Sequence, residues 1–347
     1  MVKNVEHINL ETIYCFSIKN EVAGFVYRNS QNIDLFCDEF KDRLRQFYRK
    51  TAVANILALK ETLEVLRVLH NHGIPTIPLK GALVSDLIFE DFGVYPFRDI
   101  DLLVPQTNLF KTKDVLISKC GYASLDYFSE SDLLANHYHL IFKKMMTLEV
   151  HWNLVKRYFS VPETFWWKTA RPIMWNGIKA MDLSVENNIL YHVFRLFDHC
   201  FHPLRFFVLL GGFIEKNRDS IDWNLLLGTA QSYGMRKLLV FTLRAVQDLI
   251  KIDISDVVIG KPPLGYGLFQ YLIFSGIFSG VKKKHLKMMV YTLLLIEPSL
   301  VLKLFFKRIF PSKGEIRLRY GIPTTSKKIY FYYIINPVLL FLKSQKK

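Results

Sequence analysis

The stretch IPLKGALVSDLIFEDFGVYPFRDIDLLV, residues 77–104, combines the pattern of a buried strand with two carboxylates. An apolar run ends at Lys80-Gly81, a short amphipathic segment follows, and Asp99 and Asp101 then alternate with apolar residues. Side chains at positions i and i+2 of a strand lie on the same face, so both carboxylates point the same way. Neighbouring carboxylates repel each other and are costly to bury unpaired, so the pattern predicts a cation beside them.

A divalent metal ion is the cation that suits this pair best. Mg²⁺ prefers oxygen ligands and usually lies between one or two carboxylates and the phosphates of a substrate. A third carboxylate on a neighbouring strand would complete a site for phosphoryl chemistry. Glu149, in the alternating segment TLEVHW at 147–152, is the candidate. We therefore expect Asp99, Asp101 and Glu149 to bind Mg²⁺ or Mn²⁺.

Lys80-Gly81 lies at a strand-to-helix turn and suits the binding of a triphosphate. A helix N-terminus presents free N–H groups and a positive dipole end, Gly81 lets the backbone approach a ligand, and Lys80 adds a positive charge. Arg98, directly before Asp99, is a further candidate for phosphate contact. Simpler interpretations stay open: Lys80 as a solvated edge lysine, and Arg98 as the ion-pair partner of an aspartate.

The hydrophobic periodicity around this stretch predicts a small α/β unit. A long helix is expected over 41–72, and residues 73–153 follow the order β-α-β-α-β-β. The expected strands are 74–79, 99–104, 137–143 and 147–152, with helices at 82–89 and 107–120. Pro75 and Pro78 place the first strand at an edge of the sheet. The predicted fold class is α+β, a small mixed sheet with helices embedded in a predominantly α-helical chain.

The rest of the chain is predicted to be mainly helical. Asn176-Gly177 signals a hairpin within 172–183, and Ser184 suits the N-cap of the next helix. Further helices are expected near 204–217, 223–233 and 236–251. We divide the chain into an N-terminal helical region (1–72), an α/β core (73–158), a helical domain (159–260) and a basic, aromatic-rich helical C-terminal region (261–347).

These motifs together resemble the uncharacterised bacterial nucleotidyltransferase family of the DNA polymerase beta superfamily. The resemblance rests on GIPTIPLKGALVSDLIF (73–89), RDIDLLV (98–104), KCGY (119–122), HYHLIF (137–142) and LEVHWNL (148–154), and continues to FPSKGEIRLRYG (310–321). It implies a nucleotidyltransferase-type sheet and catalysis by Asp99, Asp101 and Glu149, with Glu149 activating the acceptor hydroxyl. The superfamily's Gly-Ser or Gly-Gly signature is replaced here by Lys80-Gly81, so Lys80, Gly81 and Arg98 are the less specific nucleotide-binding candidates.

The implied reaction moves a nucleoside monophosphate from an NTP, such as ATP, to an acceptor hydroxyl that the sequence does not identify. A catalytically degenerate protein that binds a nucleotide or a partner is the alternative. His137, His139 and His151 lack the spacing of zinc ligands, and we expect structural or substrate-lining roles for them. His192, His199 and His202 are expected to pack against a helical core.

The net charge of +15 is concentrated at the C-terminal end. Residues 281–347 contain 15 Lys and Arg against Glu297 and Glu315, a balance of +13. Three interpretations remain open: a helical subdomain with solvated lysines, an anionic membrane surface as partner, or RNA. No DNA-binding motif is seen. No apolar run reaches the ~20 residues of a membrane span, and the N-terminus lacks a signal peptide. We expect a cytoplasmic protein, in the membrane interpretation peripheral to the inner face.

Overall fold

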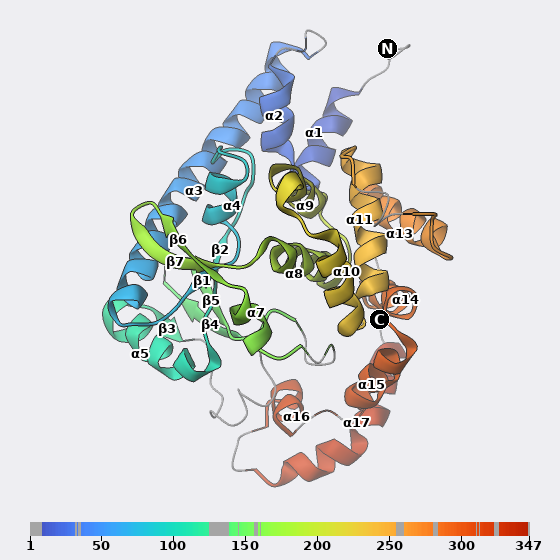
Figure 1. Ribbon diagram of the computed structural model, residues 1–347. Helices are drawn as coiled ribbons and strands as arrows, with labels where there is room; N and C mark the ends of the chain where they lie inside the picture. Colours follow the sequence, from blue (N-terminus) through green and yellow to red (C-terminus); the bar gives the residue numbers. More distant parts are fainter. Residues whose placement is uncertain are drawn as a thin grey trace.

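The computed structural model describes residues 9–31, 33, 36–124, 139–144, 146–155, 159, 161–254, 260–279, 284–309, 311, 313–322 and 326–345. A five-stranded mixed sheet lies at the centre of the fold, with long helices on one side and a helical layer on the other (Figure 1). The strands are β1 (Ile77–Pro78), β2 (Asp99–Leu103), β3 (Ala123–Ser124), β4 (His139–Lys143) and β5 (Thr147–His151). Their spatial order is β1-β2-β5-β4-β3, and only the β2–β5 pair is parallel.

One face of the sheet is apolar and is covered by two helices, α3 (Asp38–Asn71) and α5 (Leu109–Cys120). Ile100 and Leu102 of β2 and Leu148 and Val150 of β5 share a buried cluster with Leu66 of α3 and other residues of both helices. Because strand side chains alternate between faces, Asp99, Asp101, Glu149 and His151 occupy the opposite face. The apolar layer therefore fixes which way the polar residues point.

The first helices are α1 (Leu10–Lys19) and α2 (Ala23–Ser30), which pack beside α3. The buried Asn55 of α3 donates from Nδ2 to the carbonyl oxygens of Phe92 (2.7 Å) and Tyr95 (2.8 Å). These two bonds fasten the loop that leads from α4 (Ala82–Leu87) into β2. The long helix thereby positions the strand that holds the aspartates.

A second, larger apolar core lies on the polar side of the sheet. It is built mainly from α8 (Val185–Asp198), α9 (Arg205–Lys216), α10 (Trp223–Ser232) and α11 (Arg236–Ile250). Ser184 caps α8 by accepting from the backbone N of Asn187 at 3.3 Å, as its position before an apolar run predicts. The hairpin of β6 (Arg171–Trp175) and β7 (Ile178–Asp182) joins the two halves, since the N of Met181 donates to the carbonyl oxygen of Thr76.

The remaining elements are short or belong to the C-terminal region. They are the 3₁₀ turns η1 (Gln106–Asn108) and η3 (Arg218–Ser220) and the helices α7 (Thr164–Lys168), α13 (Tyr266–Ser279), α14 (Lys284–Leu295), α15 (Pro298–Ile309), α16 (Lys313–Tyr320) and α17 (Lys328–Gln345). Among the helices that the structure describes, none combines the length and hydrophobicity that a bilayer crossing requires.

The predicted fold class, the edge position of the first strand, the 172–183 hairpin and the four helices after Ser184 are confirmed. Several boundaries differ: the first strand is shorter than 74–79, and the helix expected over 107–120 begins as the turn η1. β3 was not predicted, because a strand of two residues leaves no periodic pattern. Residues 137 and 138, expected at the start of the fourth strand, lie outside the described residues.

Candidate active site

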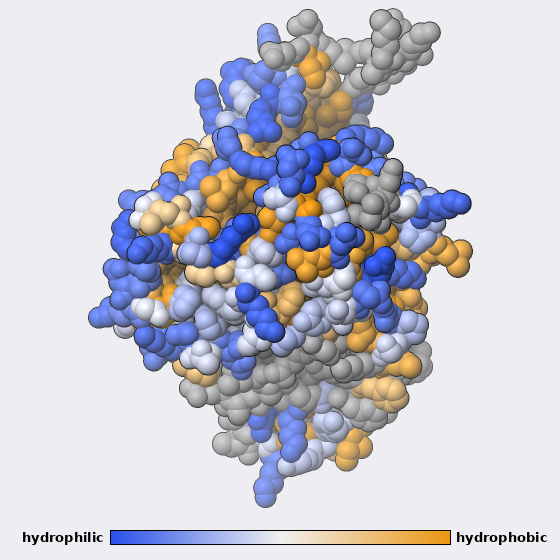
Figure 2. Space-filling view, in the orientation of Figure 1, coloured by the Kyte–Doolittle hydropathy of each residue, from blue (hydrophilic) through white to orange (hydrophobic). Residues whose placement is uncertain are grey.

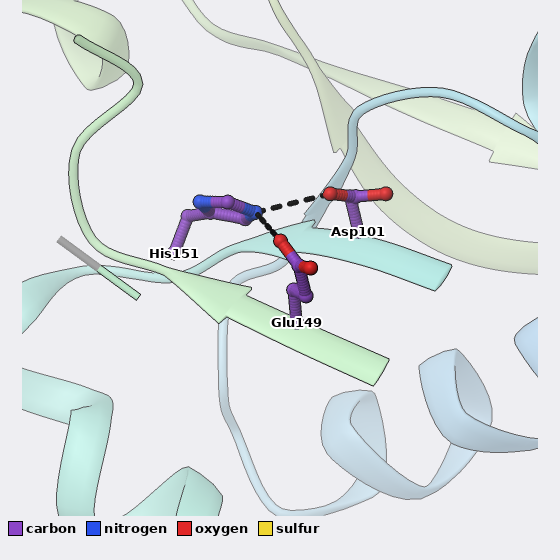
Figure 3. Close-up of side chains that lie close together, drawn as sticks. All are labelled: Asp101, Glu149 and His151. Atoms are coloured by element: carbon purple, nitrogen blue, oxygen red, sulfur yellow. Dashed lines mark hydrogen bonds and ion pairs between the residues drawn. The ribbon is translucent and has the colours of Figure 1, made fainter. Parts of the chain in front are cut away.

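The register of the parallel pair β2–β5 brings the predicted carboxylates together. Asp101 lies opposite Glu149, and Leu103 lies opposite His151. Glu149 and His151 are two residues apart on β5, so they share the face that Asp101 occupies on β2. Figure 3 shows the three side chains converging, with one ring nitrogen of His151 facing an oxygen of each carboxylate.

Asp101 is the most deeply buried member of this group, with 3% of its side chain exposed. Its Oδ1 lies 3.1 Å from Nε2 of His151, and Oε2 of Glu149 lies 3.4 Å from the same nitrogen. One ligand atom from each of Asp101, Glu149 and His151 falls within 4.8 Å of the others. That spacing suits coordination of a single ion by all three.

The chemistry of this donor set fits a divalent metal ion. Two carboxylate oxygens and one imidazole nitrogen are accepted by Mn²⁺ and other first-row ions, and carboxylates are the usual protein ligands of Mg²⁺. Burial lowers the pKa of His151 below its ordinary value, against the opposing effect of Glu149. The neutral ring that results is the form that binds metals. Asp101, Glu149 and His151 can therefore hold an ion, and Asp99 lies beside this group without belonging to it.

Lys80 pairs with both aspartates. Its Nζ lies 2.8 Å from Oδ2 of Asp99 and 2.7 Å from Oδ2 of Asp101. Burial, followed by the charge of Arg195, lowers the pKa of Lys80 to about 8. Burial by itself would raise the pKa of Asp99, but the nearby Lys80 ammonium outweighs it and the net direction is downward. Lys80 thus neutralises part of the negative charge on this face of the sheet.

Gly81 shapes the turn that delivers Lys80 to the aspartates. Its φ of 70° lies in the left-handed region, and a Cβ at this position would come within 3.0 Å of the Phe97 ring. The helix α4 that follows spans only six residues. The glycine thus has a structural reason to be there, apart from its predicted contact with a nucleotide.

Helix α8 forms the wall of the pocket that faces these residues. The pocket measures about 260 Å³, and α8 lines it with Tyr191, Phe194, Arg195 and Asp198, followed by His199. Sequence reasoning missed this wall, although Tyr191, Arg195 and Asp198 follow the i, i+4, i+7 spacing of one helix face. The expectation that His199 is packed in the core is wrong, since His199 is exposed at the pocket, whereas His192 is buried as expected.

Of the other predicted residues, Arg98 stands apart from this group, and the structure does not describe the side chains of His137 and His139. Arg98 is exposed and is not among the residues that line the pocket. The backbone of His139 pairs with that of His151 in β4–β5, and His137 lies outside the described residues. Of the three histidines considered at the outset, His151 is the one that the structure places in the pocket.

A larger hollow of about 570 Å³ lies elsewhere, between the end of α3 and the β6–β7 hairpin. Its lining is mostly apolar, with His70 and Lys179 as its titratable residues. It lacks the grouped charges that phosphoryl chemistry needs, so volume alone does not mark it as the active site.

Comparison with known proteins agrees with this geometry. The model of a family described as uncharacterised nucleotidyltransferases matches residues 6–251, which include the sheet, both aspartates, Glu149 and the α8 wall. No curated protein and no solved structure matches the chain. Because the match covers well over half of the 347 residues, the chain belongs to this family of uncharacterised nucleotidyltransferases.

Proposed function

We propose that the protein is a divalent-metal-dependent nucleotidyltransferase that moves a nucleoside monophosphate from an NTP to an acceptor hydroxyl. The observation that supports this most is the meeting of Asp101, Glu149 and His151 within 4.8 Å, beside Asp99, in a chain of this family. Enzymes of this kind work largely by positioning and by neutralising charge on the phosphates. Mg²⁺ or Mn²⁺ is the proposed ion.

Each residue has a role in this proposal. Asp101, Glu149 and His151 hold the ion, which supplies positive charge to the phosphate oxygens when bound. Lys80 holds Asp99 and Asp101 in place and adds positive charge near the phosphates. Glu149, whose side chain is 27% exposed, accepts the proton of the acceptor hydroxyl. The hydroxyl oxygen then bonds to the α-phosphorus, and pyrophosphate leaves.

The direct test is binding of each NTP with Mg²⁺ or Mn²⁺, measured by calorimetry on the wild type and on Asp99→Asn/Asp101→Asn. We expect saturable binding of at least one NTP to the wild type and its loss in the double variant. A screen for pyrophosphate release with hydroxyl acceptors then follows on the nucleotide that binds. No binding to a folded wild type would overturn the proposal.

The competing hypothesis is a protein that binds a nucleotide without turnover. It predicts binding that persists in Asp99→Asn/Asp101→Asn and no pyrophosphate release with any acceptor. The transferase predicts the opposite on both counts. The two measurements together therefore separate an enzyme from a degenerate binding module.

For the C-terminal region we propose association with an anionic lipid surface. Its helices expose apolar side chains at helical spacing: Leu268, Tyr271 and Phe278 on α13, Leu286, Met289 and Leu293 on α14, Leu302 and Phe306 on α15, and Tyr330, Phe331 and Ile334 on α17. Figure 2 shows apolar surface at the right-hand edge, over α13, and near the lower end, over α17. Residues 281–347 also hold the +13 balance.

On α14 the exposed apolar residues are all aliphatic: Leu286, Met289 and Leu293. Such residues in a region of positive charge suit a lipid interface better than RNA. Leu and Met side chains gain from entering the acyl region, whereas they offer no stacking surface to a base. This second proposal does not depend on the first, because none of these exposed residues is among those that line the pocket.

A further inference from the structure

The pocket contains a second cation, Arg195, that faces the metal-binding strands from α8. Arg195 and Lys80 both line the pocket, together with Asp99, Asp101 and Glu149. Lys80 is already engaged by two carboxylates at 2.8 and 2.7 Å. The two cations also repel each other, since Arg195 contributes to the lowered pKa of Lys80.

The guanidinium of Arg195 is held in place by aromatic rings. Its central carbon lies 4.9 Å from the ring centre of Phe206 and 5.8 Å from that of Tyr191. Cation–π contacts of this kind orient an arginine without neutralising it. Arg195 therefore keeps its charge available to a ligand in the pocket.

One end of this guanidinium has its hydrogen-bonding capacity unused. Nη1 of Arg195 is buried and, within the described part of the chain, has no hydrogen-bond partner. A buried donor without an acceptor is costly, especially a charged one. Asp198, one turn further on, also lines the pocket but has another interaction of its own. The geometry points to an acceptor that comes from outside the chain.

We propose that Arg195 is a phosphate anchor, which binds the β- and γ-phosphates of the nucleotide from the α8 side of the pocket. The planar guanidinium donates two parallel N–H groups and matches phosphate oxygens in a bidentate manner. Between Arg195 on α8 and an ion held on β2 and β5, a polyphosphate meets positive charge on both sides. The carboxylates on the sheet would repel the same polyphosphate in the absence of such cations.

This inference deepens the proposed function and assigns the polyphosphate grip to α8 rather than to Arg98. Arg98 is exposed and outside the lining of the pocket, whereas Arg195 is inside it. It also gives the helical half of the chain a part in substrate binding. The sheet and the helices around α8 would then both contribute residues that contact the substrate.

The test uses inorganic tripolyphosphate in the presence of Mn²⁺, so that the ion supplies its charge on the side of the sheet and no nucleotidyl transfer enters the measurement. Calorimetric titrations compare the wild type, Arg195→Gln, Arg195→Lys and, as a matched control, Arg236→Gln at the exposed start of α11. We expect tripolyphosphate affinity to fall about 10- to 100-fold in Arg195→Gln, which is the range for a lost hydrogen bond to a charged group. Arg195→Lys retains part of the affinity, and the control matches the wild type.

Mn²⁺ titrations followed by electron paramagnetic resonance complete the design. Arg195→Gln should bind Mn²⁺ as the wild type does, which also shows that the pocket is intact. Unchanged tripolyphosphate affinity in Arg195→Gln, or no tripolyphosphate binding to the wild type, would overturn the anchor. If Arg195→Gln does not fold, Arg195→Lys provides the test. A lysine cannot make the bidentate contact of an arginine, so the anchor requires Arg195→Lys to bind tripolyphosphate more weakly than the wild type.

Failure of the anchor and failure of the proposed function give different results. If Arg195→Gln transfers the nucleoside monophosphate with the wild-type KM for the NTP, the anchor hypothesis is wrong and the transferase hypothesis stands. If tripolyphosphate binding depends on Arg195 but the protein releases no pyrophosphate, the transferase hypothesis is wrong and the anion site is confirmed.

Discussion

Nζ of Lys80 lies 2.7 Å from Oδ2 of Asp101, and the two side chains are 10% and 3% exposed. The same nitrogen reaches Asp99 at 2.8 Å, so one ammonium group balances two carboxylates. Removal of one member of a buried ion pair leaves the other charge uncompensated, which costs about 3 kcal/mol or more. The pair therefore links the stability of the sheet to the charge balance of the pocket.

We predict that Lys80→Met lowers the free energy of unfolding in EDTA by about 3 kcal/mol, because Asp101 stays buried without its counter-charge. Addition of Mn²⁺ should raise the melting temperature of Lys80→Met more than that of the wild type, since the ion replaces the lost positive charge. Thermal unfolding with and without Mn²⁺ measures both effects. Equal melting temperatures of variant and wild type in EDTA would contradict the prediction.

The second prediction concerns His151 as a metal ligand. His151→Gln should weaken Mn²⁺ binding at least about 10-fold, because a nitrogen ligand close to both carboxylates is lost. Titration of Mn²⁺ by electron paramagnetic resonance gives the affinity directly. The control is His70→Gln, an exposed histidine on α3. If His151→Gln binds Mn²⁺ as tightly as the wild type, the ion uses the three carboxylates that the sequence alone predicts, Asp99, Asp101 and Glu149.

The fold was largely predictable because its signals are local. Apolar periodicity gave the helices before and after the sheet, and alternation gave the two strands that contain Asp101 and Glu149. The register that sets Asp101 opposite Glu149 is not a local property, since it depends on how two distant segments pair across the sheet. Sequence reasoning therefore named the carboxylates without showing that His151 would lie within reach of both Asp101 and Glu149.

The α8 wall shows what the sequence analysis left out. Tyr191, Arg195 and Asp198 recur at helical spacing, but the apolar residues between them already explained the helix as core packing. Only the packing of α8 against the polar face of the sheet places that polar stripe in the wall of a pocket. Arg98 shows the reverse: its position beside Asp99 in sequence suggested a phosphate contact, but its side chain is exposed and outside the lining of the pocket, so this role stays a prediction.

The third prediction concerns pH. Burial, followed by the charges of Arg195 and Lys80, lowers the pKa of His192 from 6.5 to about 3. Between these values the unfolded chain binds a proton that the folded chain does not, so stability falls as the pH drops through this range. Each pH unit below 6.5 costs about 1.4 kcal/mol.

His192→Phe should flatten this dependence, because Phe keeps the ring contacts with Tyr191 (5.2 Å) and Phe213 (5.9 Å) and does not titrate. Denaturant unfolding at pH 7 and pH 5 measures the difference. The wild type should lose about 2 kcal/mol more than His192→Phe between these values. Parallel losses in the two proteins would show that another group causes the acid sensitivity.

The fourth prediction tests how α3 supports β2, the strand that contains Asp99 and Asp101. Asn55→Leu removes both side-chain hydrogen bonds to the loop carbonyls of Phe92 and Tyr95. Two buried acceptors then lose their partner, which should cost about 2–4 kcal/mol. Because this loop leads into β2, NTP affinity should fall as well. Denaturant unfolding and NTP titration measure the two effects, and a variant with full stability would contradict the role of Asn55.

The last prediction concerns the C-terminal helices. Leu286→Gln/Met289→Gln/Leu293→Gln removes the exposed apolar stripe of α14 while all its charges remain. We expect flotation with vesicles of phosphatidylglycerol and phosphatidylcholine to fall at least about 10-fold, because the three aliphatic side chains would supply much of the binding energy by entering the bilayer. The matched control is Val53→Gln/Ile56→Gln/Leu57→Gln, three similarly exposed apolar residues on α3. Vesicle binding that persists in the α14 variant would contradict a lipid surface as the partner of this region. Wild-type protein that binds RNA but not the vesicles would contradict it as well.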